Sequence, residues 1–565
     1  MAKPKLLLIF PPIWDSSQPF LSIPSLTAYI RANGYEVIQR DLDIEFQDTI
    51  TSSKYLKDLI ENKQINLSEN DLKNTIEPIV KNIDNAKKTL KNSELFDKDE
   101  YFENIQIIKK AYQIVSSFYS PTKITSKSFD MRYNIKNTLN VITGTQDVKE
   151  NPFIDYYEKY FLSDIDKIKP DIIGISLTAY SQLIPALTLS RLIKLNYPNI
   201  KIVLGGFLLS LIAEPLSKFK NNFKMFFDYL IVKEGEIPLL KLMQALENNS
   251  NLSEIPNLIY LDKFEVKINK EIKPLSMNEY PSPDFDGFPL DKYIAPRLVI
   301  PLLTSRTCYY KKCSFCDMYF DTKYQLRSLD NLIKDICIIT EKYKTKYISF
   351  SDLSISAKTA CKIAKRLIDE NINIMWLTTA RIEDGYTKEV CEILYKGGCR
   401  SLLFGMESSS NRLLKLMKKG CTKEKALTVI KNTSQAGIWN HLFFMLGFPS
   451  ETKEEVQDSI NFILENLGKT INSVGVSIFS LQKNAPIGKN PQNYLIENIE
   501  SNPMFEDIAT NFEKYKTDTV DKKELQKIIN ELLSQIWIIL NAPLWMGINS
   551  YPFLPIYDEK ENLNK

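Results

Sequence analysis

The sequence of 565 residues contains a single histidine, His441, so zinc sites that need two imidazoles are excluded. Cysteine is scarce outside one region, because all eight cysteines lie between residues 308 and 421. A secreted disulfide framework would distribute its cysteines along the chain. The clustering therefore indicates a reduced compartment and a cysteine-ligated site, and we expect a cytoplasmic protein.

The sequence also lacks an excess of charge of one sign and lacks long apolar runs. Its 72 basic and 69 acidic side chains leave a net charge of +3, too balanced to indicate a nucleic-acid surface. The N-terminal run "LLLIF" is shorter than the apolar core of a signal peptide, and "IWIILNAPLWMGI" is interrupted by Asn541 and Pro543. We expect neither a nucleic acid nor a membrane as partner.

Strand and helix patterns alternate through the first 265 residues. Buried strands are predicted at "KLLLIF", "DIIGISL" and "KIVLGG", with helical patterns between them. This alternation predicts a doubly wound, Rossmann-like parallel sheet over residues 1–265, with a lysine-rich helical insert at about 51–160. The segment 266–295 contains the proline-rich stretch "YPSPDFDGFP" and is predicted to be a linker.

The second half shows six apolar, β-rich runs, and all but the last are followed by a helical pattern. These runs begin at Val299, Tyr347, Ile372, Ser401, His441 and Val474. They predict a partial (β/α)6 barrel of the TIM type over residues 296–490, so the fold class is α/β. Residues 491–565 are polar, and we expect a small helical C-terminal region there.

Polar and cysteine residues follow the strands of this predicted barrel at one end. They comprise a cysteine loop after the first strand, then Asp352, Arg381, Glu407 and Gln482 after later strands. In parallel β/α folds the loops at the carboxyl ends of the strands converge on one face. The arrangement therefore predicts one shared site.

The cysteine loop, "CYYKKCSFC", places Cys308, Cys313 and Cys316 at C-x4-C-x2-C spacing. Thiolates at this density select zinc or iron-sulfur. A structural zinc site needs four ligands, and no suitable fourth ligand lies nearby. A 4Fe-4S cluster held by three cysteines leaves one iron open to a substrate or cofactor. We therefore predict such a cluster here.

The segments "CYYKKCSFC", "FGMESSS" and "MLGFPSETKEE" resemble the core of radical S-adenosylmethionine enzymes over about residues 296–490. The more usual spacing in that family is C-x3-C-x2-C, and the longer spacing resembles one subgroup, which commonly has glycine where Thr307 stands. The resemblance implies that the open iron binds S-adenosylmethionine. Reduction through the cluster would then release a 5'-deoxyadenosyl radical.

The same resemblance implies roles for six further residues. Glu407 and Ser408 would contact the methionyl and ribose part of S-adenosylmethionine, and Arg381 its carboxylate. Phe315, Gly447 and Pro449 would lie on the adenine side. The alternative for Glu407 and Arg381 is a structural ion pair within the barrel.

The first half resembles the cobalamin-binding domain that precedes the barrel in one branch of these enzymes. The resemblance rests on "KLLLIFPP", "IPSLTAYIRANGYEV", "DIIGISL", "KIVLGG" and "KEGE". It implies that Ser176, Gly205, Gly206 and Gly235 lie near the corrin. No histidine precedes His441, so the cobalt would have no histidine ligand from this domain. The alternative is a dinucleotide-like fold with no ligand.

"YIAPRLVIPLLTSRTC" and "VGVSIFSLQKNAPIGKNP" resemble segments of a subgroup that matures ribosomally made peptides (RiPPs). This implies a precursor peptide as substrate, a flavodoxin or ferredoxin as low-potential electron donor, and cobalamin-dependent C-methylation. Radical rearrangement, cyclisation or epimerisation is the alternative, with Cys421 the only cysteine left to return a hydrogen in epimerisation. A non-catalytic iron-sulfur carrier would not need Glu407 and Arg381.

The remaining unusual residues are predicted to be packing residues. His441 begins an apolar strand at the end opposite the site. The cysteines assigned to packing are Cys337, Cys361, Cys391 and Cys399.

Overall fold

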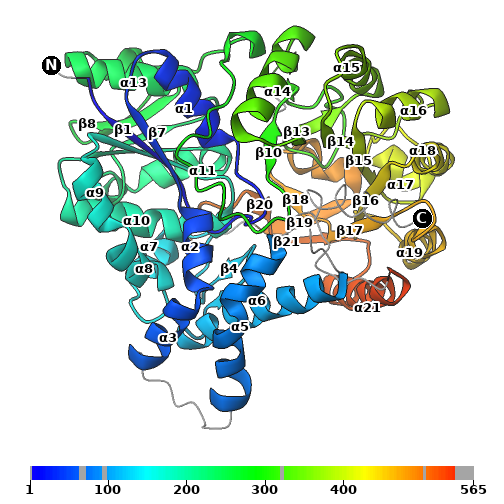
Figure 1. Ribbon diagram of the computed structural model, residues 1–565, viewed down its shortest axis with the longest axis horizontal. Coiled ribbons are helices and arrows are strands. Elements are labelled where there is room, and N and C mark those ends of the chain that lie inside the picture. Colours follow the sequence, from blue (N-terminus) through cyan, green and yellow to red (C-terminus); the bar gives the residue numbers. More distant parts are fainter. Residues whose placement is uncertain are drawn as a thin grey trace. The chain divides into compact units, whose positions relative to one another are not determined.

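The structure is a computed structural model, and it describes residues 3–62, 72–91, 98–318, 323–500, 504 and 506–540 (Figure 1). Parts of the predicted insert and C-terminal region lie outside these residues. The chain forms two compact units. Unit 1 comprises residues 1–275, 279–298 and 502–509, and unit 2 comprises 276–278, 299–501 and 510–565. Within the described residues, no helix combines the length and apolar character that crossing a membrane requires.

Unit 1 is built on a seven-stranded sheet in the order β2-β1-β5-β6-β7-β8-β9. The strands are β1 (Leu6–Phe10), β2 (Val37–Asp41), β5 (Ile172–Ser176), β6 (Lys201–Gly205), β7 (Tyr229–Ile231), β8 (Leu258–Asp262) and β9 (Glu265–Ile268). The first five are parallel, and every residue of β1 and β5 is buried, as expected for strands covered on both faces. The predicted doubly wound sheet is confirmed.

The hairpin β8–β9 at one edge of this sheet is antiparallel and was not predicted. It runs past residue 265, where the domain was expected to end. The strand β9 has no buried residue, and its sequence "EVKI" is half charged. An exposed edge strand of this kind lacks the apolar signal that identified the central strands.

Helices flank the sheet of unit 1 (Figure 1). They are α1 (Ser22–Ala32), α10 (Leu183–Asn196), α11 (Phe207–Lys218) and α13 (Glu236–Asn248). Helix α10 is buried along most of its length because α7 (Thr138–Gly144), α8 (Pro152–Tyr160) and α12 (Asn221–Met225) pack against it. The segment predicted as an insert contains α3 (Ser53–Asn62), α5 (Glu77–Leu90), α6 (Lys98–Phe118) and the short hairpin of β3 (Lys123–Ile124) and β4 (Phe129–Asp130).

The segment predicted as a linker packs on unit 1 instead of bridging freely. The Gln39 side-chain amide donates to the carbonyls of Asp284 and Asp286 at 2.7 and 2.8 Å, and Arg31 pairs with Asp284 at 2.7 Å. The aromatic rings of Phe285 and Phe288 are buried. Proline and glycine indicated a loop correctly, but these rings need apolar cover and hold the loop on the sheet domain.

Unit 2 is a six-stranded, all-parallel sheet in sequence order. Its strands are β10 (Val299–Leu302), β13 (Tyr347–Ile355), β14 (Met375–Ala380), β15 (Cys399–Glu407), β16 (Trp439–Leu446) and β17 (Ser473–Ile478). The intervening helices include α14 (Leu329–Tyr343), α15 (Ala357–Asp369), α16 (Lys388–Lys396), α18 (Lys423–Gln435) and α19 (Lys453–Asn466). A serine or threonine side chain caps the N-terminus of each of these helices. The predicted β/α architecture is confirmed.

The C-terminal region differs from the predicted helical region. Before its long helix, α21 (Lys522–Leu540), lie the short strands β19 (Ile496–Glu500), β20 (Asn511–Phe512) and β21 (Lys514–Thr517). Strand β20 pairs with β18 (Leu481–Gln482), and β19 pairs with β21. These strands are short and largely polar, so their pairing depends on neighbours that the sequence pattern does not show.

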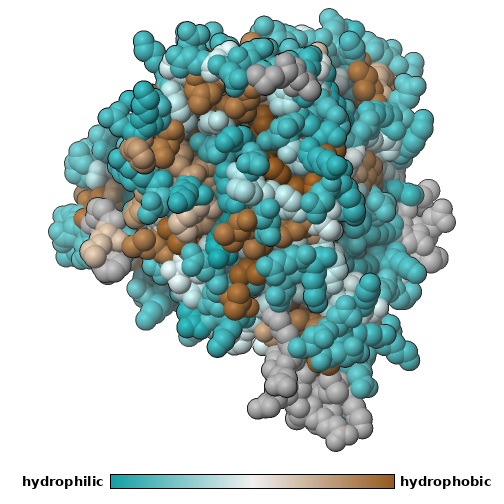
Figure 2. Space-filling model, turned by 90° about the vertical axis from the view of Figure 1, so that its left-hand side faces the viewer, coloured by the Kyte–Doolittle hydropathy of each residue, from teal (hydrophilic) through white to brown (hydrophobic). Residues whose placement is uncertain are grey.

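Apolar side chains are scattered over the surface of unit 1. Phe264, Leu195 and Val148 are among the large exposed ones. On the face drawn in Figure 2, apolar side chains form several groups separated by hydrophilic ones. Scattered exposure of this kind is ordinary for globular proteins.

Candidate active site

The cysteine loop, residues 308–316, begins just beyond the carboxyl end of β10. The buried carboxylate of Asp352, in β13, accepts hydrogen bonds from the backbone and hydroxyl groups of Thr304 and Ser305. Burial raises the pKa of Asp352 to about 6, although these hydrogen bonds oppose the shift. Asp352, predicted to face the site, thus fixes the entry of the loop.

The loop itself turns through left-handed backbone conformations. Thr307 has a φ of +65° and Lys311 a φ of +52°. A non-glycine residue in this region costs roughly 1–2 kcal/mol, and the β-branched side chain of Thr307 is especially unsuited to it. The strain at Thr307 falls where the resembling subgroup has glycine. The conformation is retained because contacts on both sides hold the loop.

A second loop, Leu416–Gly420, serves as the platform of the cysteine loop. The backbone N–H of Ser314 donates to the carbonyl of Met417 at 2.9 Å, and its hydroxyl donates to that of Leu416 at 3.2 Å. The hydroxyl of Tyr310 donates to the carbonyl of Lys418 at 2.8 Å. The sequence analysis missed this platform loop, whose signal is "KKG" after the helical pattern "NRLLKLM".

Arg381, at the carboxyl end of β14, is only 6% exposed and contacts both loops. One terminal nitrogen donates to the sulfur of Cys313 at 3.6 Å, and the other donates to the carbonyl of Lys419. The guanidinium carbon lies 3.4 Å from the ring centroid of Tyr310, a stacked cation–π contact. The structure thus brings Arg381 to the cysteine loop, while its predicted contact with S-adenosylmethionine stays a prediction.

Glu407 forms an ion pair, but its partner is Lys419 and not Arg381. Lys419 Nζ lies 2.7 Å from Glu407 Oε1, and both side chains are largely buried. Burial alone would lower the pKa of Lys419, but attraction by Glu407 and Cys313 outweighs burial and raises it. The sequence analysis missed Lys419 because a lysine beyond a helix usually indicates a solvated surface.

The backbone around Glu407 creates room for this pair. A register shift between Gly405 and Glu407 interrupts β15, and Glu407 has a φ of +69°. A Cβ atom at Gly405 would lie 2.6 Å from both Glu407 Oε1 and Lys419 Nζ. A side chain at position 405 would therefore displace the ends of the Glu407 and Lys419 side chains from the positions in which they pair.

The remaining predicted contacts lie in two places. Phe315 packs against an apolar cluster that includes Phe448, so the structure brings Phe315 to the loop of Gly447 and Pro449. Ser408 is fully buried, and its hydroxyl lies 3.5 Å from that of Ser459 on α19. The Ser408 hydroxyl also accepts a hydrogen bond from the backbone N–H of Ser410 at 3.2 Å, and its predicted contact with S-adenosylmethionine stays a prediction.

The loop after β16 is covered by the segment that leads into α21. The Thr519 hydroxyl lies 3.2 Å from the carbonyl oxygens of both Phe448 and Glu451. The buried carboxylate of Glu451 accepts a hydrogen bond from the backbone N–H of Gly447. Burial raises the pKa of Glu451 to about 7.

Replacing Glu451 with glutamine is expected to remove a pH dependence of stability. The folded state binds the Glu451 proton more tightly than the unfolded state, where the pKa lies near 4.5. The stability that this group contributes is therefore lost as the pH rises from about 4.5 through about 7. In chemical unfolding, the stability of Glu451→Gln relative to the original protein should rise by about 2 kcal/mol between about pH 5 and pH 8.

Glu454→Gln, at the exposed start of α19, is the matched control and should not reproduce this trend. Parallel pH profiles for the original protein and Glu451→Gln would contradict the assignment of the raised pKa.

In unit 1, the sheet order reverses between β1 and β5, and such a reversal opens a crevice at the carboxyl ends of the strands. Ser176 lies at the end of β5, and its hydroxyl lies 3.1 Å from that of Ser22. Gly205 and Gly206 follow at the end of β6, and Gly235 precedes α13. The four residues predicted for cobalamin thus follow or end strands of one sheet.

The loop after β1 adds residues that the sequence analysis did not single out. The side-chain oxygens Ser17 Oγ and Gln18 Oε1 are buried and have no hydrogen-bond partner among the described residues. The rings of Phe10 and Phe20 stack with centroids 4.8 Å apart, and Trp14 meets Phe20 edge-on at 5.3 Å. The Phe10 ring is itself buried and packs the start of this loop. The two oxygens without a partner are acceptors that a ligand carrying amide groups, as a corrin does, would satisfy.

The residues predicted to be packing residues differ in exposure. His441 is fully buried, with Nδ1 2.8 Å from the Ser473 hydroxyl, and burial lowers its pKa to about 3. Cys391 and Cys399 are buried, but Cys337 is exposed on α14, so its packing assignment is wrong. A cysteine within a predicted helix can lie on the buried or on the exposed face, and the sequence around Cys337 did not distinguish the two. Cys421 is buried beside the platform loop. Burial raises the pKa of its thiol, and the nearby charges of Lys419 and Arg381 oppose this shift.

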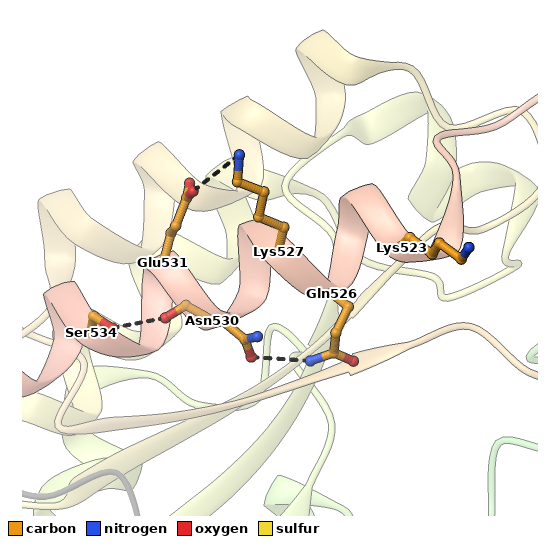
Figure 3. A pocket seen from close by; sticks show the side chains of 6 residues that line it. All are labelled: Lys523, Gln526, Lys527, Asn530, Glu531 and Ser534. Atoms are coloured by element: carbon orange, nitrogen blue, oxygen red, sulfur yellow. Dashed lines mark hydrogen bonds and ion pairs between the residues drawn. The ribbon is translucent and has the colours of Figure 1, made fainter.

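Among the described residues, no group of three or more His, Cys, Asp or Glu side chains is placed to hold a metal ion. The pocket in Figure 3 lies on one face of α21, where the Gln526 side-chain amide donates to that of Asn530 and Lys527 pairs with Glu531. It contains no predicted site residue and lies open on a single helix, so the cysteine loop remains the candidate active site.

Residues 302–463 match the family model described as "Radical SAM superfamily". This segment contains the cysteine loop, Arg381, Glu407 and the platform loop. The predicted resemblance of this segment to radical S-adenosylmethionine enzymes, a family that uses a 4Fe-4S cluster and S-adenosylmethionine, is confirmed.

The chain is also similar to an uncharacterised methyltransferase of Pyrococcus horikoshii, with 31% identity over 309 residues. That alignment covers 53% of this chain and 65% of the relative, so the chain spans a little under two thirds of the relative's length.

Two solved structures share the fold. One is the cobalamin-dependent S-adenosylmethionine radical enzyme OxsB with aqua-cobalamin and S-adenosylmethionine, at a TM-score of 0.61 and 17% identity, covering 94% of this chain and 67% of that one. The other is the radical S-adenosylmethionine methyltransferase TsrM from Kitasatospora setae, at a TM-score of 0.58 and 14% identity, covering 94% and 88%. These likenesses support the two-part fold.

Proposed function

We propose that this protein is a cobalamin-dependent radical S-adenosylmethionine enzyme that methylates an unactivated carbon of a ribosomally made precursor peptide. The observation that carries the radical chemistry is the meeting of Cys313, Arg381, Lys419 and Glu407 at the carboxyl ends of β10, β14 and β15. When bound, the cluster supplies the electron that cleaves S-adenosylmethionine, and cobalamin carries the methyl group.

The charges beside the cysteine loop fit an anionic iron-sulfur cluster. Arg381 and Lys419 are two buried cations, and Glu407 is the carboxylate that acts on Lys419. Burying an uncompensated cation is costly. A 4Fe-4S core of charge 2+ on three thiolates carries a net charge of 1−, which would balance the excess positive charge. Cys308, Cys313 and Cys316 would hold this cluster.

The chain's own residues would position S-adenosylmethionine at the open iron. Lys419 holds the carboxylate of Glu407 in one orientation, which leaves Glu407 Oε2 to accept from the methionyl amino group. Phe315 and the loop of Gly447 and Pro449 would provide the apolar surface for the adenine. An external flavodoxin or ferredoxin would supply the electron.

Cobalamin enters the proposal through unit 1. Its loop after β1 has the unsatisfied Ser17 and Gln18 oxygens described above, and the sheet order reverses between β1 and β5. One solved structure of this fold, OxsB, contains cobalamin, and the other, TsrM, is a radical methyltransferase, which supports the same interpretation here. The precursor peptide rests on the sequence resemblance alone.

Methyl-deuterated S-adenosylmethionine tests the reaction. The protein would be incubated anaerobically with hydroxocobalamin, a reductant and a peptide encoded beside its gene. Methyl transfer requires two molecules of S-adenosylmethionine, so both 5'-deoxyadenosine and S-adenosylhomocysteine should form, and mass spectrometry should find the labelled methyl on the peptide. A boiled sample and one without reductant are the controls.

A second candidate is radical rearrangement without methyl transfer, because the structural neighbour OxsB is a cobalamin-dependent S-adenosylmethionine radical enzyme. It would give 5'-deoxyadenosine alone and a product of unchanged carbon count. Such a result would contradict methylation and retain the radical domain.

A further inference from the structure

The hydrogen-bonding groups of Arg381 contact other residues of the protein, whereas a ligand-binding arginine would leave them open to a ligand. Its guanidinium is 6% exposed and lies between the Tyr310 ring, the Cys313 sulfur and the Lys419 carbonyl. Of its two terminal nitrogens, each already donates one hydrogen bond within the site. Stacking on the ring and two hydrogen bonds in the guanidinium plane together fix the orientation of the Arg381 side chain.

These contacts join three elements at one point. Cys313 belongs to the cysteine loop, Lys419 to the platform loop, and Arg381 to the end of β14. Tyr310 completes the frame, because its ring stacks on Arg381 while its hydroxyl donates to Lys418. Lys419 in turn continues the contact to Glu407. Displacing Arg381 would therefore loosen the cysteine loop and the Lys419–Glu407 pair together.

The contact with Cys313 also has an electrostatic consequence. Reducing a 4Fe-4S cluster from 2+ to 1+ adds one electron and no proton, so the cluster becomes more negative. A fixed positive charge and an N–H donor at a ligating sulfur stabilise the reduced state, because hydrogen bonds to cluster sulfurs and local charge set the potential. In a buried site this effect is weakly screened.

We infer that Arg381 is a positioning residue that raises the reduction potential of a cluster on Cys308, Cys313 and Cys316 by its hydrogen bond to the Cys313 sulfur. The inference rests on the proposed cluster. It assigns Arg381 a role distinct from binding the carboxylate of S-adenosylmethionine. Glu407 is paired with Lys419 and not with Arg381.

The test uses the full-length, reconstituted protein and the variants Arg381→Lys and Arg381→Met. The midpoint potential of the cluster, without S-adenosylmethionine, would be measured by a redox titration followed by electron paramagnetic resonance. Arg381→Met should shift the potential to more negative values. Arg381→Lys keeps the charge without the planar fork and should fall between Arg381→Met and the original protein.

Arg400→Met is the matched control. Arg400 also stacks on a tyrosine, with its guanidinium carbon 4.2 Å from the Tyr395 ring, and donates to the carbonyls of Tyr395 and Cys399. It lies at the start of β15, at the opposite end of the strand from Glu407. The potential should be unchanged in this variant.

The affinity for S-adenosylmethionine, measured on the same samples, separates the two roles. An unchanged potential in Arg381→Met with a loss of affinity would overturn the inference and assign Arg381 to the ligand. If the original protein bound no cluster at all, the proposed function would fail first, and iron analysis shows this independently. A variant that binds less iron is judged by the potential of its occupied fraction.

Discussion

Cys313→Ala is expected to abolish both the iron-sulfur cluster and the reductive cleavage of S-adenosylmethionine. The anaerobically reconstituted protein should bind about four irons per chain, and the variant should lose most of them, because three thiolates are the complete protein ligand set of such a cluster. Arg381 would also lose the sulfur to which it donates. Iron analysis, visible spectra and the yield of 5'-deoxyadenosine measure the loss. Cys308→Ala and Cys316→Ala should behave alike.

Cys361→Ala and Cys337→Ala are the controls. Cys361 lies on α15 and Cys337 on α14, outside the cysteine loop. Both variants should keep the iron content and the cleavage activity. A Cys313→Ala protein that retained four irons and full activity would disprove the cluster assignment.

Gly206→Ala is expected to destabilise unit 1 strongly. Gly206 has a φ of +104°, and a Cβ atom there would lie 2.3 Å from the Leu177 carbonyl oxygen and 2.7 Å from its nitrogen. These are backbone atoms of the loop after β5, which cannot move away like a flexible side chain. Strain and overpacking together should cost more than about 3 kcal/mol. Chemical unfolding measures this cost.

The neighbouring glycine provides the control. A Cβ atom at Gly205 would meet its nearest neighbour, the Ile231 carbonyl oxygen, at 3.7 Å, an ordinary contact. Gly205→Ala should therefore fold with nearly unchanged stability. Equal stability for Gly206→Ala and Gly205→Ala would refute the packing argument. Retention of hydroxocobalamin by Gly205→Ala would then show how closely a corrin approaches this strand end.

The geometry around Gly206 also changes the explanation for a glycine at this position. From the sequence, the glycines at the sheet edge were expected to lie near the corrin. The structure shows that at Gly206 the close neighbour is the protein's own Leu177 backbone. A glycine in a loop indicates a close approach, but only the folded chain identifies what approaches.

Much of the architecture was determined by the sequence because the signals were local. Continuous apolar runs mark strands that are buried on both faces, and serine or threonine caps begin the barrel helices. The spacing of Cys308, Cys313 and Cys316 specifies the kind of site, since a short loop must bring them together. The position of Arg381 and Glu407 after strands placed them at the same edge.

Only the tertiary structure decided the pairings within that site. Glu407 meets Lys419 instead of Arg381 because a register shift in β15 turns its backbone and Gly405 leaves space. Arg381 meets Cys313 because the platform loop, about a hundred residues beyond the cysteines, holds the cysteine loop against β14. The strands before α21 and the edge hairpin β8–β9 were missed for the same reason. Their residues are largely polar, so pairing with distant segments, which no local pattern encodes, sets their conformation.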